Sequence, residues 1–206
     1  MNFNHIFLRL LSCLIGWGTV GIVYNFTGKI SDHATLLSPS WVDNTVAYST
    51  NAIWVYLSFF LFIPFGYLFS AYHRIRSLML AMIVCALVSG AVYLIYPTTM
   101  HYPFIECISL SERALCDLIS VDSPQNLLPS LHVSLTLVML SALWSQHHKF
   151  RTTLYLLWAA AICFSVLVLK RHLFIDVVTG AITAIAALYI ARWIQNRLPH
   201  GESASE

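Results

Sequence analysis

Charged residues are scarce in this chain: of its 206 residues only 10% are Asp, Glu, Lys or Arg, whereas 58% are hydrophobic. A soluble domain carries about 25% charged residues, so an ordinary water-soluble globule is excluded. Intrinsic disorder is excluded as well, because a chain this apolar has ample surface to drive collapse. The net charge of +2, with no stripe of basic residues, argues against nucleic-acid binding. The composition instead indicates a protein embedded in a lipid bilayer.

Long apolar runs account for most of the hydrophobic residues. A membrane-spanning helix needs about 20 mostly apolar residues, and several stretches approach that length. The predicted spans are residues 6–26, 52–72, 77–96, 131–145, 153–169 and 177–194. The sequence therefore predicts an all-α, polytopic membrane protein, a single domain of residues 1–206 built as a bundle of six transmembrane helices.

The connections between the spans are short except for residues 97–130, and so long a hydrophilic connection in a compact domain suggests function. The next span is expected to begin at Pro129, since proline suits the first turn of a helix. A cleaved signal peptide is an alternative for the first span, which is long for such a peptide and is followed by no small-x-small cleavage site. Inside this span, Gly16, Gly18 and Gly21 follow no strand, so they predict close helix packing rather than a dinucleotide site.

The basic residues predict an orientation, because those in short loops stay preferentially on the cytoplasmic side. With the N-terminus inside, the inner set is Arg9, Arg74, Arg76, Lys149, Arg151, Arg192 and Arg197. The smaller outer set is Lys29, Arg113, Lys170 and Arg171. Most acidic residues also fall outside: Asp32, Asp43, Glu106, Glu112, Asp117, Asp122 and Asp176. We therefore expect both termini in the cytoplasm and the long loop at the outer face, which in a bacterial cell is the periplasmic face of the inner membrane.

Two of the five cysteines, Cys107 and Cys116, lie in the outer loop, nine positions apart. An oxidising compartment would allow a disulfide between them. Sequence alone does not give their separation in space, so a disulfide and two free thiols both remain open.

Two histidines and one carboxylate are expected to meet at the outer face. His132 opens the fourth span, and the segment from Lys170 to Asp176, which contains His172, leads into the sixth. His172 and Asp176 would share one face of a helix, since four residues rise about 6 Å. A carboxylate that accepts from one imidazole nitrogen leaves the other with its lone pair exposed, as a nucleophilic or basic histidine requires.

The neighbouring groups suit a phosphate. Ser130 places a helix N-terminus at the same face, where free backbone N–H groups favour an anion. Lys170, Arg171 and Arg113 offer fixed positive charge. Each of these residues also has a simpler interpretation. Asp176 alone would suit a helix N-cap, His132 a structural role, and Lys170 and Arg171 contacts with lipid headgroups.

Together the motifs resemble a known family. Pro129-Ser130-Leu131-His132 and His172-x-x-x-Asp176 are similar to the second and third signature motifs of the type-2 phosphatidic acid phosphatases. The form with Leu131, preceded by Asp122-x-Pro124-x-Asn126, resembles the branch related to inositol phosphorylceramide synthases.

This resemblance implies a six-helix membrane enzyme that acts on a lipid phosphate or pyrophosphate without a metal or other cofactor. His172 would be the nucleophile that forms a phosphohistidine, Asp176 would orient it, and His132 would protonate the leaving group. The expected substrate-binding residues are Lys170, Arg171, Arg113, Ser130 and Asn126. The expected partners are the bilayer and a phospholipid or polyprenyl phosphate, and no nucleic acid.

The chain departs from the family pattern in its phosphate-binding positions. The first motif, a Lys followed seven positions later by Arg-Pro, is absent near the end of the third span, and Val166 stands where the third motif would have an Arg. Two alternatives therefore stay open: a non-catalytic transporter subunit or scaffold, and a metal-dependent membrane hydrolase that uses the two histidines and the carboxylate as ligands. A channel is disfavoured, because none of the spans has an ionisable residue at mid-depth. The specific lipid, the choice between hydrolysis and transfer, and the oligomeric state do not follow from the sequence.

Overall fold

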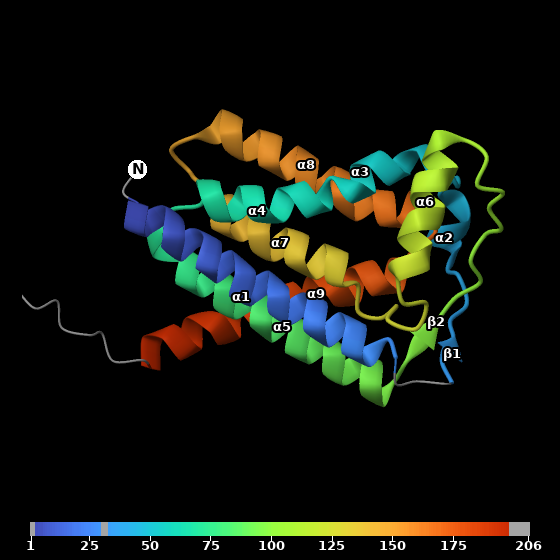
Figure 1. Ribbon diagram of the computed structural model, residues 1–206, viewed down its shortest axis with the longest axis horizontal. Coiled ribbons are helices and arrows are strands. Elements are labelled where there is room, and N and C mark those ends of the chain that lie inside the picture. The colour runs from blue at the N-terminus through green and yellow to red at the C-terminus, as the bar shows by residue number, and fades with distance from the viewer. Residues whose placement is uncertain (1–2, 30–32, 198–206) are drawn as a thin grey trace, which may run out of the picture.

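Helices dominate the computed structural model, which describes residues 3–29 and 33–197 (Figure 1). Asp32, counted above on the outer side, lies outside these residues. The elements in chain order are α1 (Phe3–Thr27), β1 (Thr35–Leu36), α2 (Trp41–Thr45), the 3-10 helix η1 (Thr50–Ala52), α3 (Ile53–Leu57), α4 (Phe59–Phe69), the 3-10 helix η2 (Tyr72–Arg74), α5 (Ile75–Ile95), β2 (Thr98–Thr99), α6 (Leu110–Val121), α7 (Leu131–Leu143), α8 (Lys149–Val168) and α9 (Phe174–Arg197).

The helices confirm an all-α membrane protein and refine the predicted spans. The helical segments long and apolar enough to cross a bilayer are Asn4–Thr27, Thr50–Phe69, Tyr72–Ile95, Lys149–Val168 and Phe174–Arg197. The second of these consists of η1, α3 and α4 in succession. The fourth predicted span, α7, has only 13 residues. At 1.5 Å per residue it is about 20 Å long, shorter than a hydrocarbon core of about 30 Å.

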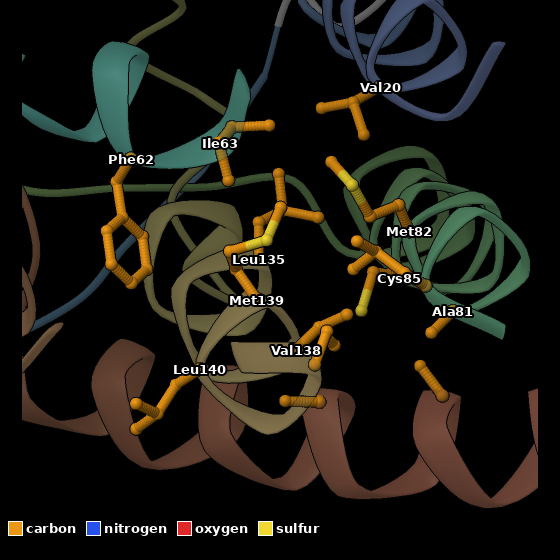
Figure 2. Close-up of a cluster of buried hydrophobic side chains, with 14 of the residues drawn as sticks. Val20, Phe62, Ile63, Ala81, Met82, Cys85, Leu135, Val138, Met139 and Leu140 are labelled. Atoms are coloured by element: carbon orange, nitrogen blue, oxygen red, sulfur yellow. The ribbon is translucent and has the colours of Figure 1, made fainter. Parts of the chain in front are cut away.

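The short helix α7 lies at the centre of the bundle, in contact with α4, α5, α8 and α9 (Figure 1). Its side chains are buried on nearly every side, which explains an apolar sequence with no polar stripe. Leu135, Val138 and Met139 pack against Phe62 of α4 and Met82 of α5 in the main core (Figure 2). A helix enclosed by others need not reach the membrane surface at both ends.

The start of α7 is fixed by a side-chain cap rather than by proline. Ser130 is the N-cap, and its hydroxyl accepts a hydrogen bond from Val133 N at 3.4 Å. Pro129 lies one residue before this cap, after a cis peptide bond with Leu128. The expectation that Pro129 occupies the first helical turn is therefore wrong, because the hydroxyl of Ser130 satisfies the free N–H group there.

Helix α9 approaches the start of α7 unusually closely at Gly180. A Cβ atom at Gly180 would lie 2.6 Å from the carbonyl oxygen of Ser130 and 3.1 Å from Val133 Cβ. Ser130 N donates to the carbonyl of Asp176 at 3.1 Å, and the Ser134 hydroxyl donates to the carbonyl of Gly180 at 3.0 Å. The absence of a side chain at Gly180 thus brings the beginnings of α7 and α9 together.

Among the glycines of α1, close packing is confirmed at one position. A Cβ at Gly16 would lie 2.5 Å from the Tyr67 hydroxyl of α4, whereas a Cβ at Gly18 or Gly21 would meet nothing within 4 Å. The packing prediction is wrong for the latter two.

The non-spanning elements gather at one end of the bundle, which we call the histidine end because it holds His132 and His172 (Figure 1). Strands β1 and β2 form a two-residue parallel pair there. Cys107 and Cys116 form a disulfide with their Cα atoms 6.2 Å apart, joining the loop before α6 to that helix. The question that the sequence left open is thereby answered in favour of the disulfide.

Candidate active site

His132 lies in the first turn of α7, held by aromatic rings. Its ring centroid is 4.4 Å from that of Tyr56 and 4.5 Å from that of Phe59. The hydroxyl of Tyr56 lies 3.4 Å from His132 Nδ1. His132 Nε2 is buried and has no hydrogen-bond partner among the described residues. The imidazole is therefore fixed on one side and has an unused nitrogen on the other.

His172 lies in the tight turn between α8 and α9. Its backbone N–H donates to the carbonyl of Val166 at 3.2 Å, and Lys170 turns the chain with a positive φ of 50°. His172 Nδ1 lies 3.4 Å from Asp176 Oδ2. The expected proximity is thus present, although His172 precedes the helix rather than lying within it.

Asp176 is fully buried at the beginning of α9. Its Oδ2 also accepts a hydrogen bond from Leu173 N at 2.7 Å. Since α9 begins at Phe174, Asp176 is the third helical residue and not the N-cap that the simpler interpretation proposed. It binds an N–H group at the helix start and approaches His172 through the same oxygen.

The two histidine rings lie across a small polar cavity, with their centroids 6.3 Å apart. The side chains that line this cavity belong to Tyr24, Tyr56, Tyr93, Tyr102, Asp122, Ser123, Asn126, Leu127, Leu131, His132, Arg171 and His172. Its free volume is about 10 Å³, room for about one water molecule. The cavity is therefore polar, and the side chains around it leave almost no free space.

An ion pair between Arg171 and Asp122 occupies one wall of this cavity. Arg171 Nη2 lies 2.6 Å from Asp122 Oδ2, and the two side chains are only 6% and 14% exposed. The Tyr24 hydroxyl donates to Asp122, and the Arg171 guanidinium lies 4.5 Å from the centroid of the Tyr102 ring. Arg171 is therefore a buried cation held directly beside both histidines.

The ionisation of this pair follows from its surroundings. Burial alone would raise the pKa of the Asp122 carboxyl, but Arg171 and the Tyr24 hydrogen bond outweigh burial and hold that pKa below its usual value. Burial would likewise lower the pKa of Arg171, and the Asp122 carboxylate reverses this and raises it. Both groups are therefore charged at neutral pH.

Unsatisfied polar atoms are concentrated around the cavity. In residues 3–29 and 33–197, seven buried side-chain nitrogen or oxygen atoms have no hydrogen-bond partner. Five of them belong to Ser123, His132, Arg171, His172 and Asp176. Native proteins rarely leave such groups unpaired without a reason, so this cluster is suited to a polar ligand.

The other residues expected to bind substrate lie elsewhere or serve the scaffold. The Lys170 ammonium donates to the carbonyl of Asp43 and, at 2.7 Å, to that of Val46. Arg113 is exposed on α6, and neither Arg113 nor Lys170 lines the cavity. This corrects the expectation that three cations surround the histidines, because the turn after α8 directs Lys170 toward α2 and α6 carries Arg113 away.

Ser130 and Asn126 hold the backbone segments around the site in place. Ser130 is fully buried and caps α7. Asn126 lines the cavity, but its amide nitrogen donates to the Tyr24 carbonyl at 2.9 Å and to the Thr27 hydroxyl at 3.0 Å, which ties the loop before α7 to the end of α1.

Asp43, for which the sequence predicts no role at the site, supports the turn that carries His172. Asp43 is buried, and its Oδ1 accepts from Phe174 N at 2.7 Å, the first N–H group of α9. Its Oδ2 accepts from the backbone N–H of Ser40 at 2.8 Å in a capping box. The Ser40-x-x-Asp43 spacing is a signal of such a helix start, but nothing in the sequence indicates that the same carboxylate reaches α9.

An apolar groove of about 290 Å³ adjoins the polar cavity, between α1, α4, α6 and α7. Trp17, Gly21, Phe60 and Leu135 line it, and it shares His132 with the cavity, together with Tyr24, Tyr56, Asp122 and Leu131. A ligand with a polar head and an apolar chain therefore has adjoining places for both parts.

The side chains of the site do not form a metal centre. Across the described ranges, no three His, Cys, Asp or Glu residues are grouped so that they could hold a metal ion. His132, His172 and Asp176 therefore do not converge as the metal-dependent alternative requires.

Fold and site together define an integral membrane protein of apolar helices with a histidine-lined polar cavity at one end. The family model of the PAP2 superfamily matches residues 105–199. This stretch contains α6 to α9 and, within the site, Asp122, His132, Arg171, His172 and Asp176. No curated protein matches the chain. No solved structure matches it either.

Proposed function

We propose that the protein is a membrane lipid phosphatase or phosphotransferase that acts on a lipid phosphate or pyrophosphate through a phosphohistidine intermediate. The observation that carries this proposal is the pair of histidines facing each other across a cavity that also holds Arg171 and adjoins an apolar groove. The PAP2 superfamily match over the same residues supports activity on a lipid phosphate. The Asp122-x-Pro124-x-Asn126 segment further supports a place in the branch related to inositol phosphorylceramide synthases.

His172 is the proposed nucleophile. With Nδ1 turned toward Asp176, a proton on Nδ1 leaves the lone pair on Nε2. Nε2 attacks phosphorus, the bond from phosphorus to the leaving oxygen breaks, and His132 donates a proton to that oxygen from its unpaired Nε2. Neutral His132 then takes a proton from water or from a lipid hydroxyl, whose oxygen attacks phosphorus and breaks the bond to His172. Hydrolysis and transfer differ only in this acceptor.

Arg171 is the proposed ligand of the phosphate oxygens, since charge on the equatorial oxygens must be stabilised during phosphoryl transfer. In the structure its partner is the Asp122 carboxylate, and the cavity of about 10 Å³ is too small for a phosphoryl group. Substrate binding therefore requires the carboxylate to withdraw, so that phosphate oxygens replace it on the guanidinium.

The proposed location is the plasma membrane, which in a bacterial cell is the inner membrane, with both termini in the cytoplasm and the histidine end at the outer or periplasmic face. The distribution of basic residues supports this orientation. The disulfide between Cys107 and Cys116 also supports it, because such bonds persist in oxidising compartments.

A panel of lipid phosphates tests the activity. Full-length protein in detergent is assayed for phosphate release from phosphatidate, phosphatidylglycerol phosphate and polyprenyl diphosphate, with and without a lipid alcohol as acceptor. Wild type should turn over at least one of them, and His172→Ala should not. His147→Ala is the matched control, since His147 is exposed at the other end of the bundle. Equal rates for wild type and His172→Ala would show that the proposal is wrong.

A further inference from the structure

A second cavity lies at the end of the bundle opposite the histidines, among α5, α7 and α9, and measures about 570 Å³. It exists because α7 ends at Leu143, whereas α9 continues to Arg197 beside it. Leu78, Leu137, Val138, Leu140 and Leu188 form its apolar lining. The short central helix thus leaves a hollow, lined by both apolar and polar side chains, between helices that cross the membrane.

The polar residues of this hollow are basic or neutral. They are His73, Arg74, Ser77, Ser141, Arg192 and Gln195. Every acidic side chain in the described part of the chain is at the histidine end: Asp43, Glu106, Glu112, Asp117, Asp122 and Asp176. Among the described residues, the positive charge around the hollow therefore has no carboxylate nearby to neutralise it.

The two arginines are placed differently. Arg74 Nη1 donates to the carbonyls of Ser141 at 3.4 Å and Ala142 at 3.3 Å, so it caps the C-terminal end of α7. Arg192, on α9, is exposed and has no hydrogen bond or ion pair with any other residue that the structure describes. One cation is thus fixed in the wall, and the second is available to a ligand.

We propose that this hollow binds an anionic phospholipid, with the phosphate held by Arg74 and Arg192 and the acyl chains against the leucine-rich lining. A soluble anion would make no contact with that lining, and a lipid of zero net charge would leave the positive charge of the two arginines uncompensated. Clusters of basic residues beside membrane helices attract anionic headgroups in this way. This site is separate from the proposed active site and does not depend on any catalytic activity.

Native mass spectrometry of the full-length protein in detergent tests the site, with phosphatidylglycerol and phosphatidylcholine offered in equal amounts. Wild type should retain phosphatidylglycerol in preference. Arg192→Gln should weaken that retention about fivefold, whereas Arg192→Lys should keep most of it. Arg197→Gln is the matched control, because Arg197 lies on the same helix outside the cavity, with its guanidinium 4.4 Å from the Trp193 ring centroid.

Two further results decide the proposal. His172→Ala should leave phosphatidylglycerol retention unchanged, since His172 lies at the opposite end, and excess inorganic phosphate should not displace the lipid. Equal retention of the two lipids by wild type would overturn the proposal. So would equal losses in Arg192→Gln and Arg197→Gln, or displacement by inorganic phosphate, which would indicate a site for a soluble anion.

Discussion

Replacement of Gly180 by alanine tests whether the contact between α7 and α9 sets the geometry of the histidines. The added Cβ would lie 2.6 Å from the Ser130 carbonyl oxygen. An ordinary contact begins near 3.4 Å, so the helices must separate by about 0.8 Å at this point. The atom in the way belongs to the backbone, and no rotamer change can relieve the clash.

The separation of α7 from α9 should affect both the stability of the fold and the rate of lipid-phosphate turnover. Overpacking of this kind typically costs about 1–3 kcal/mol. Ser130 lies two residues before His132, and Gly180 lies on the helix that carries Asp176. A displacement of about 1 Å between reacting groups costs on the order of 100-fold in rate. We therefore expect Gly180→Ala to lower the Tm and to reduce turnover of a lipid phosphate by roughly 10- to 100-fold.

Gly18→Ala is the matched control, because it is also a helical glycine but its Cβ would meet nothing within 4 Å. It should keep or slightly raise the Tm, since alanine favours a helix more than glycine does. Thermal unfolding in detergent and phosphate release measure the two effects. If Gly180→Ala matched Gly18→Ala in both, the close approach of α7 and α9 would not position the site.

Three other changes probe the site. Asp122→Asn should lower stability by roughly 3 kcal/mol, because it leaves the buried Arg171 without its partner. Because the pKa of Asp122 is depressed, the ion pair should contribute its full stability to wild type above about pH 4. This stability should be lost as the pH falls through the depressed pKa. Tm measurements over this pH range should show the loss in wild type and not in Asp122→Asn. Gly21→Leu should fill the apolar groove and slow long-chain lipid phosphates more than short-chain ones, and Gly18→Leu, outside the groove, should not show this selectivity. Excess EDTA should leave phosphate release unchanged, and a loss that added metal restores would favour the metal-dependent alternative.

The spans and the histidine pair could be predicted because they depend on patterns along the sequence and not on contacts between distant segments. Hydropathy marks a helix that crosses a bilayer, and two polar motifs at the starts of late spans must meet at one face if the topology alternates. The length of α7 was not predictable in this way. Its run of apolar residues has the composition of a spanning helix, yet in the structure its side chains face other helices on nearly every side.

The partners of the charged residues depend on tertiary contacts between distant segments. Lys170 and Arg171 are adjacent in sequence, but the turn at Lys170, with its positive φ of 50°, directs Lys170 to the carbonyls of Asp43 and Val46 and Arg171 to Asp122. Asp43 reaches α9 across more than 130 positions. The distribution of charges along the sequence predicts the side of the membrane on which such residues lie. Which of them lies beside a histidine depends on the tertiary contacts of the turns.

His172 is the residue proposed to carry the phosphoryl group during turnover. The most direct measurement is to quench the protein, during reaction with a phosphate-labelled lipid, under alkaline conditions that preserve phosphohistidine, and to locate the label by peptide mass spectrometry. Wild type should carry the label on His172, and His172→Ala should carry none. Turnover by wild type with the label on another residue, or with no covalent label, would contradict this proposal.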